Sequence, residues 1–302
     1  METNAVQVRN LRKVYGDRTV VDDVSFDIEQ GETFAILGPN GAGKSTVVEI
    51  LEGYRRRSGG EASVLGVDPG EGGLDWKARI GIVLQTTASP GPVTVREQLR
   101  EFAGFYPNPR DVDEVIAAIG LEDQAKTRVS KLSGGQQRRV DVAMGIIGRP
   151  ELLFLDEPTT GFDPHARREF WDLIRSLKAE GTTILLTTHY LDEAAQLADR
   201  VAVIAAGRVR AIGPVDGFGG EQARVPVVKW TEDGVQRHQR AEDPFEFATA
   251  LAARLGEAPA ELEIVRPSLE DVYLALVAEE SEHGGSEHDA ALAAASAKGA
   301  AR

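Results

Sequence analysis

Short apolar runs alternate with longer stretches of mixed polarity through the first two thirds of the chain. The runs indicate β-strands, because they are rich in Val, Ile and Leu and end at turn residues. They cover 6–8, 24–28, 33–37, 152–155, 183–186 and 201–204. Apolar positions three and four residues apart predict amphipathic helices at 95–106 and 112–119. The pattern predicts an α/β fold with a mixed or parallel sheet, into which a helical subdomain is inserted at about 86–148.

The pattern changes near Phe218, where we expect the core of the first domain to close. Residues 221–278 predict two strands, a helix, a strand and a second helix that opens with a capping box of Ser268 and Asp271. From Glu279 onward, alanine, glycine, serine and charged residues offer too little apolar surface to offset the entropy of ordering. We therefore expect a domain at 1–218, a small α+β domain at 219–278 and a disordered tail at 279–302.

Composition narrows the class of protein. The absence of cysteine excludes disulfides, thiolate metal sites and a cysteine nucleophile, and it fits a reducing cytoplasm. The first residues lack the pattern of a signal peptide, and no run approaches the roughly 18 apolar residues of a membrane span. The net charge of −14 opposes binding to nucleic acid, and we expect the basic cluster at 55–57 to be a solvated loop.

The segment GPNGAGKST lies where an apolar strand ends and a helix is predicted to begin, and it matches the phosphate-binding P-loop in full. Glycine lets successive backbone N–H groups face a phosphate, and the helix N-terminus adds partial positive charge. Lys44 is expected to neutralise the β- and γ-phosphates of ATP, and Ser45 to offer its hydroxyl to Mg²⁺. The alternative is a glycine turn that only starts a helix. The predicted nucleotide-binding residues here are Gly38, Pro39, Asn40, Gly41, Ala42, Gly43, Lys44, Ser45 and Thr46.

A second segment, LLFLDEP at 152–158, places two carboxylates at the end of a predicted buried strand. Open α/β sheets bind their ligands at that edge. We expect Asp156 to hold the metal, and Glu157 to polarise a water for attack on the γ-phosphate. An apolar strand that ends in two acids is common by itself, so this interpretation depends on the P-loop.

The segment LSGGQQRR at 132–139 resembles the signature of the ABC ATPases. Ser133 can cap a helix, and Gly134 and Gly135 expose N–H groups at its positive end, with Gln136 beside them. Taken alone, the segment is also consistent with a turn before a helix. Because the chain has one P-loop, this second phosphate cradle suggests that it serves the ATP of another copy, which gives a two-fold dimer with two shared sites.

Four further positions match the ABC family in order. Tyr15 corresponds to the aromatic platform for adenine, Gln85 to the glutamine that senses Mg²⁺ and water, and His189 to the switch histidine at the γ-phosphate. Asp163, in GFDP, corresponds to the D-loop residue that links the two sites, with Phe162 in place of the usual leucine. Three of the four have an ordinary alternative: core packing for the tyrosine, a polar strand end for the glutamine, and a strand cap for the histidine.

The resemblance covers about residues 5–215. The segments THYLDEAAQLADRVAVI and RPSLEDVYLALV resemble the bacterial drug-resistance, daunorubicin-type exporter branch of the family. That resemblance implies separate transmembrane permease subunits, a drug-like or lipophilic cargo, and a place on the inner face of the cell membrane. It also implies that residues 86–105 form the groove for the permease, and that 219–278 form a regulatory or stabilising extension.

Two other functions stay open at this stage. A soluble ABC ATPase of translation or DNA repair usually has two ATPase domains or a long coiled coil, and the sequence has neither. An importer subunit usually has a β-rich barrel in its C-terminal region, where this chain predicts a short mixed extension.

Overall fold

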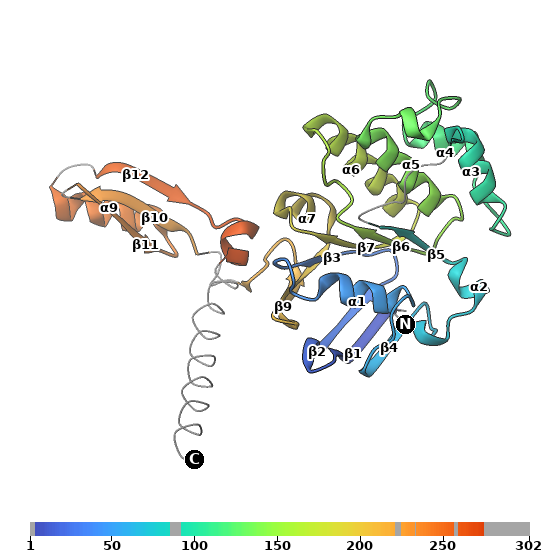
Figure 1. The fold of residues 1–302 in the computed structure, drawn as a ribbon. Helices are drawn as coiled ribbons and strands as arrows, with labels where there is room; N and C mark the ends of the chain where they lie inside the picture. The colour runs from blue at the N-terminus through green and yellow to red at the C-terminus, as the bar shows by residue number, and fades with distance from the viewer. Residues whose placement is uncertain (1–3, 85–91, 221–224, 233, 257–258, 275–302) are drawn as a thin grey trace, which may run out of the picture. The chain divides into compact units, whose positions relative to one another are not determined.

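The structure, a computed structural model, describes residues 4–84, 92–220, 225–232, 234–256 and 259–274 (Figure 1). The chain divides into two compact units, Met1–Arg210 and Ala211–Arg302. The sequence placed the boundary a few residues later, after 218. The predicted tail at 279–302 lies outside the described residues.

The main sheet of the first unit has six strands in the order β5-β6-β7-β3-β8-β9. Their bounds are β3 Thr33–Leu37, β5 Ile80–Val83, β6 Leu152–Asp156, β7 Thr183–Thr188, β8 Arg200–Ala205 and β9 Arg208–Pro214. From β5 to β8 every neighbouring pair is parallel. All residues of β3 and β7 are buried, as expected for central strands covered on both faces. The predicted α/β fold with a mixed or parallel sheet is confirmed, and its ligand-binding edge lies at the carboxyl ends of β3 and β6.

A second, antiparallel sheet has the order β2-β1-β4. Its strands are β1 Asn4–Tyr15, β2 Arg18–Glu29 and β4 Gly59–Val64. The two sheets share one core, in which Phe26 of β2 stacks on Phe34 of β3 with ring centroids 5.3 Å apart. This shared core fixes the β1–β2 hairpin beside the loop that follows β3.

Helices complete the first unit. They are α1 Lys44–Leu51, α2 Leu74–Lys77, α3 Val95–Ala103, α4 Val112–Ala118, α5 Gly134–Ile146, α6 Pro164–Ala179 and α7 Leu191–Leu197, with short 3-10 turns at Pro69–Glu71 and Val129–Lys131. Helices α3, α4 and α5 contact one another and form the predicted helical subdomain (Figure 1). Helix α3 begins at Thr94, whose side chain makes a capping box with Glu97. Among the helices of the described ranges, none has the length and apolar character needed to cross a membrane.

The second unit has its own small core. Strands β10 Val227–Glu232, β11 Val235–Arg240 and β12 Ala260–Val265 form an antiparallel sheet in the order β11-β10-β12. Helix α9, Pro244–Leu255, packs on it through Leu251, which lies against Val228 and Trp230. A further helix opens at 269, and Ser268 and Asp271 make the expected reciprocal capping bonds. The order of elements is the one that the sequence predicted.

Candidate active site

The P-loop connects the end of β3 to the start of α1. Close packing requires two of its glycines, Gly38 and Gly43. A Cβ on Gly43 would lie 2.8 Å from the Val20 carbonyl oxygen, and φ at this residue is +101°. A Cβ on Gly38 would lie 2.1 Å from the carbonyl oxygen of Ile204. Because Gly43, at the N-cap of α1, has no side chain to accept their hydrogen bonds, the first N–H groups of the helix can bind an anion.

Lys44 lies at the centre of this loop. Its side chain is buried, and Nζ donates to the carbonyl oxygens of Gly38 at 2.8 Å and Pro39 at 3.2 Å. Burial lowers the pKa of the ammonium, while the charges of Glu157 and Asp156 oppose that shift. A buried cation beside uncapped helix N–H groups fits the phosphates of a nucleotide.

The two predicted acids reach the same region from the end of β6. Asp156 accepts a hydrogen bond from the Thr187 hydroxyl, and the N–H of Glu157 donates to the Thr187 carbonyl oxygen at 3.0 Å. An Oε1 atom of Glu157 lies 3.3 Å from Nδ1 of His189, which follows β7. The structure therefore brings together the predicted base and the predicted switch histidine.

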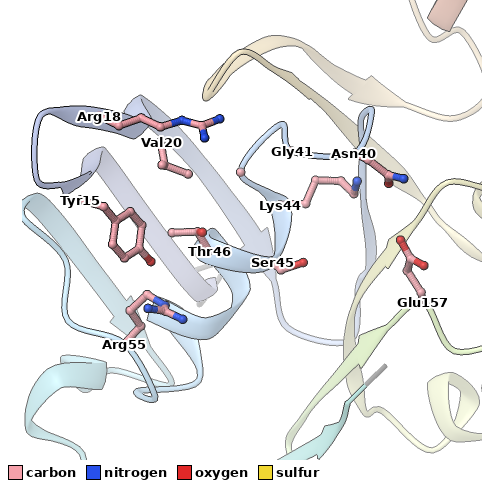
Figure 2. Close-up of a pocket in the computed structure, with 11 residues that line it drawn as sticks. Tyr15, Arg18, Val20, Asn40, Gly41, Lys44, Ser45, Thr46, Arg55 and Glu157 are labelled. Carbon is pink, nitrogen blue, oxygen red and sulfur yellow. The ribbon is translucent and has the colours of Figure 1, made fainter. Parts of the chain in front are cut away.

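A cavity of about 640 Å³ opens over the P-loop (Figure 2). Its lining comes from the P-loop, the β1–β2 hairpin, Arg55 and Glu157. The lining residues are Tyr15, Arg18, Val20, Asn40, Gly41, Gly43, Lys44, Ser45, Thr46, Arg55 and Glu157. Tyr15 is 38% exposed, which fits a platform for a base better than core packing.

Arg18, Val20 and Arg55 also line this cavity, and no sequence motif includes them. Arg18 pairs with Tyr15 across the hairpin, so strand pairing was the signal that could have found it. The expectation of a solvated loop at 55–57 is wrong for two arginines. Arg55 lies 5.3 Å from the Tyr15 ring centroid and is ion-paired with Glu49, and Arg57 makes a two-pronged ion pair with Asp68.

The signature segment caps α5 as predicted. The Ser133 hydroxyl accepts from the Gln136 N–H at 3.3 Å, and the Gln136 side chain accepts from the Ser133 N–H at 3.0 Å. A Cβ on Gly134 or Gly135 would meet nothing within 4 Å. Around the cavity, as far as the structure describes it, none of these four residues contributes to the lining.

The predicted D-loop residues lie at the start of α6. Asp163 is the N-cap of α6 and accepts hydrogen bonds from the N–H groups of His165 and Ala166, which lower its pKa. Phe162 is buried edge-on against Phe170, so the change from leucine keeps an apolar contact. Gln85 lies outside the described residues.

The oxygen donors near the P-loop suit Mg²⁺. Ser45 lines the cavity, and Asp156 ends the strand that also carries Glu157. In the part of the chain that the structure describes, three or more His, Asp or Glu side chains nowhere gather as a metal site. Mg²⁺ needs no such cluster, because in nucleotide sites it takes one or two protein ligands together with phosphates and water.

The site has a phosphate-binding loop at the carboxyl edge of a parallel sheet and two acids at the end of another strand of that edge. This arrangement defines a P-loop nucleoside triphosphatase.

Comparisons with known proteins identify the family within this class. The family model described as ABC transporter matches residues 21–160. Among curated proteins, the chain is 40% identical to the Nod factor export ATP-binding protein I of Rhizobium johnstonii over 92% of this chain and 96% of that protein.

A second relative with the same name, from Neorhizobium galegae, is 38% identical over 93% of this chain and 87% of that protein. An ATP-binding subunit of an ABC transporter has the same fold, with a TM-score of 0.68 at 24% identity over 90% of this chain and 99% of that one. So does a dimeric ATP-binding cassette bound to ADP and phosphate, with a TM-score of 0.64 at 24% identity over 70% of this chain and 100% of that one. The chain belongs to the ATP-binding subunits of ABC transporters, and it is an ATPase.

Proposed function

We propose that two copies of this chain close around two ATP molecules and thereby drive export through separate transmembrane permease subunits. The observation that carries the proposal is the position of the signature residues. Ser133, Gly134 and Gly135 form a helix N-terminus that lies outside the cavity of their own chain, with Ser133 and Gly134 exposed and Gly135 half-buried. Two glycines in a helix cost about 1 kcal/mol each relative to alanine, and none of the residues that the structure describes would contact a Cβ at either position. A phosphate held by a second subunit explains their presence.

The chemistry follows from the residues around the P-loop. Lys44 and the N–H groups of α1 hold the β- and γ-phosphates, and Tyr15 offers its ring to adenine. Ser45 and Asp156 would hold Mg²⁺, which would neutralise the negative charge of the phosphates. Gln85 is proposed to help these two residues hold the ion. Glu157 accepts a proton from the water whose oxygen bonds to the γ-phosphorus, while the bond from that phosphorus to the bridging oxygen breaks. The products are ADP and inorganic phosphate.

His189 and Asp163 complete the proposed cycle. His189 lies 3.3 Å from Glu157, which supports the proposal that it senses the γ-phosphate, and Asp163 is the N-cap of α6. Closure of the dimer on ATP is the step that moves the permeases, and hydrolysis reopens it. This role puts the chain on the inner face of the cell membrane, bound to a permease.

The permease contact has a candidate surface in the first unit. A cavity of about 550 Å³ lies between the sheet edge and the helical subdomain, and Ile82, Leu84, Phe102 and Tyr106 line it. Ile82 and Leu84 are exposed apolar residues, which is a common property of binding grooves. We propose that a helix of the permease enters here, next to the expected segment 86–105.

The proposed direction of transport is supported by the relatives, and the proposed cargo by the sequence resemblance. Both carry a name that describes Nod factor export, which favours an exporter over an importer or a soluble ATPase. The sequence resemblance to drug-resistance exporters suggests a drug-like or lipophilic cargo, and it is kept as a proposal.

Complementation between subunits tests the shared site. Ser133→Arg should abolish hydrolysis and leave ATP affinity in the monomer unchanged, because the P-loop is intact. Lys44→Ala should lose ATP binding. Mixing the two variants should restore ATPase activity, since one composite site in each mixed dimer is intact. A mixture that stays inactive, although the two variants form mixed dimers, would refute the proposal.

A further inference from the structure

Arg138 is a buried arginine in the second turn of α5, five residues after Ser133. Burying a guanidinium is costly unless its N–H groups are hydrogen-bonded. Its Nε donates to the Pro158 carbonyl oxygen at 3.0 Å, and its Nη2 donates to the Asp156 carbonyl oxygen at 3.0 Å. Its Nη1 donates to the carbonyl oxygen of Leu84, just after β5. The side chain thus binds the backbone of two other segments.

The two carbonyls at the Nε and Nη2 edge belong to the residues on either side of Glu157. Those two nitrogens share one edge of the planar guanidinium, so their spacing is fixed. The distance between the two carbonyl oxygens is therefore fixed as well, and the residue between them is held in place.

Glu157 has a backbone conformation that needs such support. Its φ is +45°, in the left-handed region that costs a residue with a Cβ roughly 1–2 kcal/mol. Such residues persist where the surrounding structure over-determines them, and they concentrate at functional sites. The N–H of Glu157 is held by the Thr187 carbonyl oxygen, and Arg138 holds the carbonyls before and after it.

The ion pair of Arg138 does not account for its position. The nearest carboxylate oxygen with which it pairs belongs to Asp141, at 3.8 Å, which is beyond hydrogen-bond distance. Its closest contacts are the backbone carbonyls, so charge neutralisation is secondary to fixing the backbone.

We propose that Arg138 is a positioning residue for hydrolysis: it fixes the backbone around Glu157 and so aims that carboxylate at the attacking water. The inference rests on the proposed function, which makes Glu157 the base. The proposed role of Arg138 differs from that of Ser133. Arg138 would act on hydrolysis of the ATP held by its own chain, whereas Ser133 would bind the ATP held by the partner.

Two substitutions test the role in the homodimer. Arg138→Met keeps the length of the side chain and removes every donor, and kcat should fall at least about ten-fold, since a misplaced catalytic group is costly. ATP affinity in the monomer should stay within about two-fold, because the P-loop is untouched. Arg138→Lys, which keeps the charge and three donors, should recover part of kcat. A loss of folding alone would lower the melting temperature and ATP binding together.

Arg139→Met is the matched control. Arg139 is the next residue of the same helix, and it pairs with Glu169 and with the carbonyl of Ile119 instead of the backbone around Glu157. It should lose clearly less kcat than Arg138→Met. An equal or larger loss in the control would overturn the inference.

Mixed dimers locate the effect. In the mixture of Ser133→Arg and Lys44→Ala subunits, the first supplies the working P-loop and Glu157, and the second supplies only the signature. Arg138→Met added to the first subunit should lower activity at least about ten-fold, and added to the second by less than about three-fold. Equal losses, or a loss confined to the second, would show that Arg138 acts on the signature helix. Should the parent mixture itself be inactive, the shared site fails, and the homodimer comparison decides on Arg138 independently.

Discussion

The substitution Glu157→Gln tests whether the carboxylate acts as a base, because it removes proton acceptance and keeps the position of the side chain. Glu157→Gln keeps the shape of the side chain, and its backbone hydrogen bond to the Thr187 carbonyl, at 3.0 Å, does not depend on the carboxylate. The amide can still contact His189, which lies 3.3 Å from the carboxylate in the structure. The substitution therefore removes proton acceptance and one negative charge, and little else.

The expected magnitude follows from the role. General-base help is worth about 100-fold to 10,000-fold in rate, which corresponds to roughly 3–5 kcal/mol of activation free energy. ATP binding should be preserved or strengthened, because a carboxylate near the phosphates is removed. Without hydrolysis, the closed dimer should accumulate.

Two measurements check this prediction: phosphate release at saturating ATP and Mg²⁺, and gel filtration with and without ATP. Phosphate release should fall by at least about 100-fold, and the variant should elute as a dimer only with ATP. Asp172→Asn is the matched control, since this carboxylate lies on α6, is 75% exposed and pairs with Arg175. Full ATPase activity in Glu157→Gln would remove the residue from the role of base.

Two more predictions concern stability. Burial, with the nearby charges of Asp156 and Glu49, raises the pKa of Glu52 to about 7, so the folded protein binds more protons than the unfolded chain between about pH 4.5 and 7. Stability should fall as pH rises through that window, by at most about 3 kcal/mol, and Glu52→Gln should flatten the profile of urea unfolding. Trp230→Ala should lower the free energy of unfolding of the second unit by about 3–5 kcal/mol, because Trp230 is buried against Phe247. Limited proteolysis should then cut the chain beyond residue 211, while the P-loop still binds nucleotide.

Local signals were enough to locate the P-loop and the start of its helix. Residues 33–46 contain the buried strand, the glycine turn and the helix start in one continuous stretch, so no distant contact is needed to find them. Ser133 and Ser268 were predicted as caps for the same reason, because a helix cap depends on residues three positions apart.

Contacts between distant segments could not be predicted from the sequence. Arg57 was expected in solvent because its partner, Asp68, lies eleven residues later in a segment with no periodic pattern. Strand β4, Gly59–Val64, was not predicted, because its two glycines and polar residues resemble a loop until β1 pairs with it. The contacts of Arg138 join residues 18 to 54 positions apart, and no pattern along the chain records them.

Thr187 links the two acids on the hydrolytic side of the site. Its hydroxyl donates to Asp156 and its carbonyl oxygen accepts from the N–H of Glu157, so one fully buried residue of β7 contacts both the last residue of β6 and the residue after it. The proposed metal ligand and the backbone of the proposed base therefore share one anchor. A displacement of β7 relative to the phosphates is expected to move both of them together.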